Sequence, residues 1–333
     1  MRIVHVGDAR PSSVFVARWA EDLAKRHDVH VISFYRAELD GIKVHVVPRV
    51  LLGVPYGDRM LGMMVKAILA KIKPDVVHAH YTTSYAYVAA LANYHTLLVQ
   101  AWGSDIWVAS EMGEKWQKRT ELALKKADRV LMTSDALRQH IEIRYGRSEK
   151  MVVIPPIGID LKVFAYRPDR DGRQFVVFSP RGGDGRPHYR QDVIDEAMQI
   201  MAGSGSFPTL KYIKAPTEKS KEEMAELYHR ADCVISVPYS DQFASTLQEA
   251  MACGCVPIAA DLPAYRGYLK HGWNARVLGK VAAPEIVEQV IWCMENREGR
   301  QEYRERNRGI AEREFDWDKC MKGLEEIYEE VGK

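Results

Sequence analysis

The sequence predicts an α/β protein with two domains, each a doubly wound unit built around a parallel sheet. Short apolar runs alternate with longer stretches of helical period, as in βα units whose sheet is buried on both faces. This alternation fills the first half of the chain, stops near residue 165 and then starts again. The 333 residues, 47% of them hydrophobic, supply enough apolar surface for two cores of ordinary size.

Apolar runs of strand length mark the expected strands. In the first half they are residues 2–6, 29–34, 43–47, 75–78, 97–101, 129–133 and 151–154. In the second half they are residues 175–179, 210–213, 232–237, 256–259 and 275–278. Phe15, Trp19 and Leu23, spaced by four, share one face of the first intervening helix. Between residues 198 and 232 we expect one strand and one helix, the helix over 218–229.

Composition excludes several classes of protein. The 47 basic and 45 acidic residues leave a formal charge of +2, far from the excess that a nucleic-acid-binding protein needs, so no nucleic acid partner is expected. Five cysteines without a CxxC pair suit a reducing compartment better than a disulfide framework. The first ten residues run straight into a strand with no signal-peptide pattern, and no apolar stretch reaches about 18 residues. We therefore expect a cytoplasmic protein, with a peripheral contact at the inner face of the membrane left open.

The segment 236–261 carries the strongest functional signal. Residues 241–246 follow a strand, at the edge where an open parallel sheet holds its ligand. The next helix presents unpaired N–H groups and the positive end of its dipole to an anion such as a diphosphate. Asp241 and Glu249 lie eight residues apart across this helix start. The simpler alternative is that Asp241 only caps the helix or turn, although capping does not require the second acidic residue.

The run Glu249-Ala-Met-Ala-Cys-Gly254, followed by Val256-Pro-Ile258, resembles the signature of glycosyltransferase family 4, the group 1 glycosyltransferases. These are retaining enzymes of the GT-B fold, which has two facing Rossmann-like domains. The family signature places two glutamates eight residues apart, and Asp241 and Glu249 hold these positions. The departures are Asp for Glu at 241 and Ala244 where Gly is frequent, and we expect them to change the fit of the sugar.

The resemblance implies a role for each residue of the segment. Asp241 accepts hydrogen bonds from hydroxyls of the donor sugar, and Glu249 holds the ribose hydroxyls. The backbone between them lies along the sugar and diphosphate. The expected donor-binding residues of this segment are Asp241, Gln242, Phe243, Ala244, Ser245, Thr246 and Glu249.

A basic, glycine-rich loop follows the strand 175–179. Arginine offers planar, bidentate donors to phosphate oxygens, and the resemblance implies an arginine at this strand end and a second cation about five residues later. Arg181 fits the first position, and Arg186 fits the second with Arg190 as its rival. Tyr189 lies near a position that is Lys in many relatives. The alternative is a solvated loop whose arginines have no specific role. Arg181, Asp241 and Glu249 are the expected catalytic residues.

Two strand ends of the first half also carry polar residues. The segments His78-Ala-His80-Tyr81 and Trp102-Gly-Ser-Asp105 resemble family segments, and they make His80, Trp102 and Asp105 the acceptor-side candidates. Gly7, in the loop after the first strand, is expected near the diphosphate. His78 and His80 share a strand face, which raises a metal site as an alternative. No third ligand stands at a useful spacing, and the resemblance implies an enzyme without metal or cofactor, so His78 is expected in the core.

The resemblance extends over nearly the whole chain. Pro155, Pro156 and Gly158 break the pattern, and the charged stretch 167–173 is typical of a linker. Residues 315–317 look like the start of the family's closing helix, which crosses back to the first domain. We therefore expect an acceptor-side domain over 1–164 with the helix 315–333, and a nucleotide-sugar domain over 165–314.

The segment 58–73 has two interpretations. Its methionines lie on one side of a predicted helix and its lysines and arginine nearby, so it suits an anionic lipid surface. The favoured alternative is a crossover helix packed on the sheet.

These observations predict a hexosyltransferase that moves a sugar from a UDP-, GDP- or ADP-sugar to a glycan or lipid-linked acceptor. The family mechanism, front-face attack by the acceptor, is the working expectation. Two rivals stay open: a nucleotide-sugar epimerase of GT-B shape, and a non-catalytic subunit that binds the nucleotide sugar.

Overall fold

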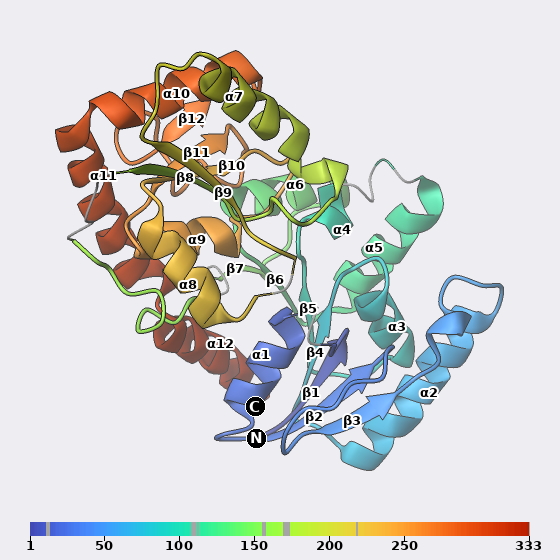
Figure 1. Ribbon diagram of the computed structural model, residues 1–333. Helices are drawn as coiled ribbons and strands as arrows, with labels where there is room; N and C mark the ends of the chain where they lie inside the picture. Colours follow the sequence, from blue (N-terminus) through green and yellow to red (C-terminus); the bar gives the residue numbers. More distant parts are fainter. Residues whose placement is uncertain are drawn as a thin grey trace. The chain divides into compact units, whose positions relative to one another are not determined.

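The computed structural model describes residues 1–10, 14–107, 111, 113–154, 158–168, 174–217 and 219–332. They divide into two compact units, Met1–Ile154 with Met321–Lys333, and Pro155–Cys320 (Figure 1). The predicted break at Pro155 and Pro156 and most of the predicted linker lie outside the described residues, as does the side chain of Phe15.

The first unit contains a parallel sheet of seven strands in the order β3-β2-β1-β4-β5-β6-β7. Its strands are β1 (Arg2–Gly7), β2 (Asp28–Ser33), β3 (Lys43–Val46), β4 (Val76–His80), β5 (Leu97–Gln100), β6 (Arg129–Met132) and β7 (Met151–Val153). The order runs one way from β1 and the other way from β4. The loops after these two strands therefore diverge, and such a switch point is where open parallel sheets bind ligands.

Helices cover both faces of this sheet, as Figure 1 shows. They are α1 (Val14–Leu23), η1 (Arg49–Leu51), α2 (Gly57–Ile72), α3 (Tyr85–Ala92), α4 (Ser104–Trp107), α5 (Glu114–Lys126) and α6 (Asp135–Tyr145). Leu61, Val65 and Leu69 of α2 pack with Val4 and Val77 on one face, because alternate strand residues point to opposite sides. The predicted crossover helix over 58–73 is thus α2.

The last helix, α12 (Trp317–Val331), returns to the first unit. Glu325 pairs with Arg26 at 2.9 Å and with His27 at 3.0 Å, and the hydroxyl of Tyr328 lies 2.6 Å from Nδ1 of His78. These contacts fix its second half against β4 and the turn between α1 and β2, so the closing helix expected from the resemblance is present.

The second unit contains a parallel sheet of five strands in the order β12-β11-β10-β8-β9. The strands are β8 (Phe175–Ser179), β9 (Leu210–Lys214), β10 (Cys233–Ser236), β11 (Val256–Ala260) and β12 (Arg276–Leu278). The helices are η2 (Pro187–Tyr189), α7 (Gln191–Gly203), α8 (Lys221–Arg230), α9 (Ser245–Ala252), α10 (Ala283–Glu295), α11 (Arg297–Ile310) and the π-helical turn η3 (Ala311–Phe315). Apolar clusters lie on both faces, which confirms the second doubly wound unit.

Every predicted strand is present within two residues of its predicted bounds. The helix predicted over 218–229 begins at Lys221, because Ser220 and Glu223 form a capping box. Residues 158–168 lie in the second unit, where Ile159 N donates to the carbonyl of Phe315 at 2.7 Å and Phe164 is buried.

Candidate active site

Two arginines share one aromatic ring in the loop that leaves β8. The guanidinium carbons of Arg181 and Arg186 lie 5.0 and 4.9 Å from the centroid of the Tyr189 ring. Asp184 offsets one of their two charges: Arg186 Nη2 lies 2.6 Å from its Oδ2, and Arg181 Nη1 lies 3.7 Å from the same atom. The hydrogen bond from Arg186 holds the pKa of Asp184 below its usual value. The result is a compact cationic cluster with donors left to face an anion.

Close backbone packing positions this cluster. A Cβ atom on Gly182 would lie 2.6 Å from Cβ of Lys214, and one on Gly183 would lie 2.6 Å from the carbonyl oxygen of Ala215. Thr217 Oγ1 also donates to the carbonyl of Gly183 at 2.8 Å. The glycines are therefore required where the loop lies against the end of β9.

The short helix η2 joins this loop to the segment after β10. His188 Nε2 donates to the carbonyl of Ser240 at 2.6 Å, and Tyr239 N donates to the carbonyl of His188 at 3.1 Å. These bonds bring Tyr189 and its arginines beside Asp241. Sequence reasoning missed His188, whose only signal is its place between Arg186 and Tyr189.

Asp241 is the acidic member of the site. Burial raises its pKa to about 6, and the charge of Arg181 is the largest influence in the other direction. The hydroxyl of Tyr265 donates to its Oδ2 at 3.4 Å. The carboxyl group therefore lies within electrostatic reach of the arginine cluster. Tyr265 was not predicted, since a tyrosine two dozen residues downstream carries no local signal.

The segment from Gln242 to Thr246 begins with buried residues and continues into the first turn of α9. Phe243 packs on Tyr268 at a ring distance of 4.4 Å and is buried, so its backbone and not its side chain is available. Ala244 is the N-cap of α9 and provides no side-chain cap, and Ser245 opens the helix. The hydroxyl of Thr246 is buried and makes no hydrogen bond within the described part of the chain. Gln242 is buried as well.

Glu249 lies further along α9, beside the buried Tyr228. The pKa of Tyr228 is raised well above its usual value, first by burial and then by the charge of Glu249. Tyr228 donates to the carbonyl of Thr246 at 3.1 Å, which ties it to the first turn of the helix. Arg181 and Asp241 thus influence each other directly, whereas Glu249 lies in the Tyr228 environment.

Arg190, the rival for the second phosphate position, points elsewhere. Its Nη2 donates to the carbonyl of Val281 at 2.7 Å, and its guanidinium lies 4.8 Å from the ring of Tyr239. Of the two candidates, Arg186 is the one that shares the Tyr189 ring with Arg181.

The acceptor-side candidates lie in the first unit. His80 is buried and stacks on Trp102 at a ring distance of 5.9 Å. Gly7 ends β1 under this pair, and a Cβ there would lie 3.0 Å from Cγ2 of Val16 and 3.4 Å from Cδ2 of His80. Gly7 therefore makes room for the packing of α1 and His80.

Asp105 has a buried carboxylate that accepts two backbone bonds. Thr82 N donates to Oδ2 at 2.7 Å and Trp102 N to Oδ1 at 2.9 Å. Burial raises the pKa of Asp105 to about 6, against the effect of these bonds. Asp105 thus fixes the turns after β4 and β5 to each other and positions Trp102.

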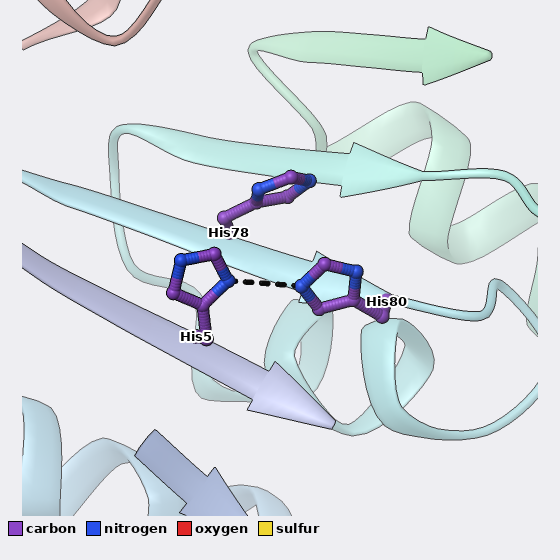
Figure 2. A group of neighbouring side chains, drawn as sticks. All are labelled: His5, His78 and His80. Atoms are coloured by element: carbon purple, nitrogen blue, oxygen red, sulfur yellow. Dashed lines mark hydrogen bonds between the residues drawn. The ribbon is translucent and has the colours of Figure 1, made fainter. Parts of the chain in front are cut away.

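His78 has a third histidine beside it that sequence reasoning missed. Figure 2 shows His5 of β1 next to His78 and His80 of β4, with Nδ1 of His5 3.0 Å from Nε2 of His80. Parallel pairing sets His5 opposite His78, a register that the spacing along one strand does not reveal. Burial lowers the pKa of His5 to about 3 and lowers those of His78 and His80 well below the usual value.

Among the described residues, these histidines are the one group of three or more potential ligands close enough for a metal ion, with one ligand atom from each lying within 4.8 Å of the others. Zinc would need these atoms near 2.0–2.1 Å from one centre, which requires the group to contract and the bond between His5 and His80 to break. A divalent cation would also be buried here among neutral rings with no carboxylate in the group. The arrangement fits a buried cluster of neutral imidazoles better than a metal centre.

A pair of parallel-sheet units, one of them with an arginine pair and a carboxyl group beyond its strand ends, defines the class of GT-B glycosyltransferases. A family model described as glycosyl transferase 4-like matches residues 2–134, and one described as glycosyl transferases group 1 matches residues 211–309. The chain belongs to the group 1 glycosyltransferases and is an enzyme of that type.

Relatives and solved structures agree with this assignment. The chain is 21% identical to an uncharacterized glycosyltransferase of Methanocaldococcus jannaschii, over 93% of both chains. It is 24% identical to a D-inositol 3-phosphate glycosyltransferase of Nocardiopsis dassonvillei, over 76% of this chain and 74% of the relative. The structure of Anabaena HepE in complex with UDP-glucose superposes with a TM-score of 0.75 at 18% identity, covering 99% of this chain and 100% of HepE.

Among the described residues, no helix is both long enough and apolar enough to cross a bilayer.

Proposed function

We propose that this glycosyltransferase moves a hexose from a nucleoside diphosphate sugar to a glycan or lipid-linked acceptor with retention at the anomeric carbon. The observation that carries the proposal is the arginine pair on Tyr189 with Asp241 beside it. In the reaction, the bond from the anomeric carbon to the diphosphate oxygen breaks and its electron pair leaves with the diphosphate. The acceptor oxygen forms the new bond on the same face and gives its proton to the departing phosphate oxygen.

Arg181 and Arg186 stabilise the charge that develops on the leaving diphosphate. Preorganised donors of this kind commonly supply the largest catalytic term. The cluster is preorganised because Asp184 and Tyr189 already hold the guanidinium groups together before any ligand arrives. The N–H groups at the start of α9 add a second, uncharged source of phosphate binding.

Asp241 holds the sugar. As a carboxylate, it accepts hydrogen bonds from sugar hydroxyls, and the hydroxyl of Tyr265 orients it. Glu249 holds the ribose in this proposal, and the family resemblance supports that role. The UDP-glucose complex of HepE makes UDP-sugars the first donors to test.

The reaction proceeds without a metal ion in this proposal. Two guanidinium groups supply the positive charge that a divalent cation otherwise provides to a diphosphate. The three buried histidines lack the carboxylate that would balance a metal ion.

The acceptor is proposed to be presented at a membrane surface or on a glycan. Two of the relatives are named for D-inositol 3-phosphate, which is neither a glycan nor lipid-linked, so the acceptor panel includes it as a third class. A contact with the inner face of the membrane is part of this proposal.

A donor screen tests the proposal. The melting temperature of the chain is expected to rise with one of UDP-glucose, GDP-mannose and ADP-glucose, because a ligand that binds the native state stabilises it. With that donor and an acceptor panel, transfer should persist in EDTA. Proton NMR of the donor alone separates the rivals: an epimer would indicate an epimerase. Binding without hydrolysis or transfer across the panel would indicate a non-catalytic subunit.

A further inference from the structure

Helix α2 has two apolar faces. Leu61, Val65 and Leu69 are buried against the sheet. Met60 and Met63 lie on the opposite side of the helix at 47% and 64% exposure. The crossover interpretation of this segment therefore explains only one of its faces.

The exposed apolar surface formed by these methionines continues over the segment that precedes α2. Val50 and Tyr56 are each 79% exposed, and Val54 is 44% exposed. This segment lies against the start of α2, since a Cβ on Gly57 would collide with the carbonyl oxygen of Leu51. We call the resulting surface the methionine patch. Its members are Val50, Val54, Tyr56, Met60, Met63 and Met64.

The patch stands out from the rest of the surface. Its members are six of the twelve large apolar side chains that are exposed among the described residues. Single exposed apolar side chains are ordinary, whereas contiguous ones mark an interaction surface.

Basic side chains border the methionine patch. The stretch 43–73, to which all its members belong, contains six basic residues and one acidic residue, Asp58. Asp58 is itself neutralised, because it forms an ion pair with the buried Arg119. Arg59 and Lys66 lie on the exposed part of α2 beside the methionines, and Arg49 is exposed next to Val50.

A groove of about 660 Å³ opens beside the patch. Its charged lining residues are Asp58, Glu114, Lys115, Lys118 and Arg119. Two of these cations are paired, Lys118 with Glu114 and Arg119 with Asp58. Lys115 Nζ donates to the carbonyl of Gly53 at 3.0 Å, which ties the groove to the segment before α2. The groove thus adds Lys115 beside the apolar surface, while its other cations are balanced by carboxylates.

We propose that the methionine patch and its basic surroundings bind the surface of an anionic phospholipid bilayer. The apolar side chains enter the boundary between headgroups and acyl chains, and the cations pair with the lipid phosphates. The charge argues for this occupant, because an apolar protein partner would not require the exposed cations Arg49, Arg59 and Lys66 beside the apolar side chains. The proposal gives the membrane contact of the proposed function its location, and it does not depend on catalysis.

Vesicle flotation with the full chain and no sugar donor tests it. Binding is expected to vesicles of phosphatidylcholine mixed with phosphatidylglycerol, to be absent with phosphatidylcholine alone, and to weaken as salt rises. Met60→Ser combined with Met63→Ser and Met64→Ser should reduce the bound fraction about ten-fold or more. Ile143→Ser combined with Ile200→Ser, at exposed apolar positions elsewhere, is the matched control and should bind as the wild type.

Charge reversal gives a second comparison. Arg59→Glu with Lys66→Glu should abolish the preference for phosphatidylglycerol, whereas Lys125→Glu with Lys322→Glu should retain it. Equal binding by the patch variants and their controls would overturn the proposal. So would a dimer in sedimentation that the serine variants dissociate while vesicles stay unbound, which would assign the patch to a second copy of the chain. Arg181→Ala should bind vesicles normally, so a failed proposal here is distinguishable from a failed catalytic one.

Discussion

At the scale of single residues, the positive charge of the site comes from two arginines that have the same neighbours. Arg181 and Arg186 contact the same ring and the same carboxylate, so each is held by partners that remain when the other is removed. Each arginine therefore has a separable contribution, and single substitutions can rank them.

Arg181→Ala is expected to lower kcat/KM for the donor about 10²- to 10³-fold, the usual effect of removing one preorganised donor at developing charge. Arg186→Ala should lower it as well, and by more than Arg190→Ala, because the Arg190 guanidinium is directed to Val281 and Tyr239. Initial rates with the verified donor give the ranking. An unchanged rate for Arg181→Ala would remove this residue from the mechanism.

The raised pKa of the Asp241 carboxyl group predicts how kcat/KM depends on pH. With a pKa of about 6 it is protonated below that pH and then accepts fewer hydrogen bonds from the sugar. We expect kcat/KM to fall on the acid side of about pH 6, since this parameter reports groups of the free enzyme.

Two variants show which carboxyl group causes this fall of kcat/KM at acid pH, the acid limb of the pH profile. Asp241→Asn should lower the rate and flatten the limb, whereas Asp105→Asn, at the other carboxyl group with a pKa of about 6, should keep it. A limb that persists in Asp241→Asn would assign it to another group.

At the scale of elements, the arginine loop works because its backbone lies against β9. Gly183→Ala would place a methyl group against backbone atoms of Ala215, Pro216 and Thr217, so the loop has to shift. A shift of about 1 Å in a catalytic group can lower kcat/KM by up to about 10²-fold.

The matched control is Gly203→Ala, since a Cβ at the end of α7 would meet no atom within 4 Å. Kinetics and melting temperature of both variants are compared. We expect Gly183→Ala to lose activity by far more than its change in melting temperature explains. Equal kinetics in the two variants would show that the loop position is unimportant.

At the scale of the whole molecule, the buried histidines couple the fold of the first unit to pH. His5, His78 and His80 are neutral when folded because burial lowers their pKa values, and unfolding lets them take up protons below about 6.5. The unfolded state then binds more protons, so the free energy of unfolding falls as pH decreases. For His5 the window runs from 6.5 to about 3. The slope reaches about 1.4 kcal/mol per pH unit for each histidine.

Denaturant unfolding between neutral and acid pH measures this slope. His5→Asn should reduce it, and His95→Asn, at an exposed position, should leave it unchanged. Asp105 and Asp241 act in the opposite direction between their ordinary pKa of 3.8 and about 6, so the comparison of variants isolates the histidine contribution. An equal slope in the two variants would contradict the assignment of this pH dependence to the buried histidines.

The sequence alone determined the elements of both units and the residues of the arginine loop. Strands that are buried on both faces are continuous apolar runs, and the turns between them are marked by glycine, proline and charge, so both are readable locally. Arg181 lies two residues beyond β8, in the same kind of locally marked turn. Asp241 lies in the loop after β10, and its eight-residue spacing from Glu249 in the family signature identified it.

Only the tertiary structure decided which residues far apart in the sequence meet. His5 joins His78 and His80 through the pairing of β1 with β4, and Tyr265 reaches Asp241 from beyond β11. The choice between Arg186 and Arg190 as the partner of Arg181 also needed coordinates. So did the finding that α2 packs one face on the sheet while the methionine side predicted from the sequence stays exposed. The physical reason is that strand pairing and side-chain direction depend on chain closure over long separations, which no local pattern of residues encodes.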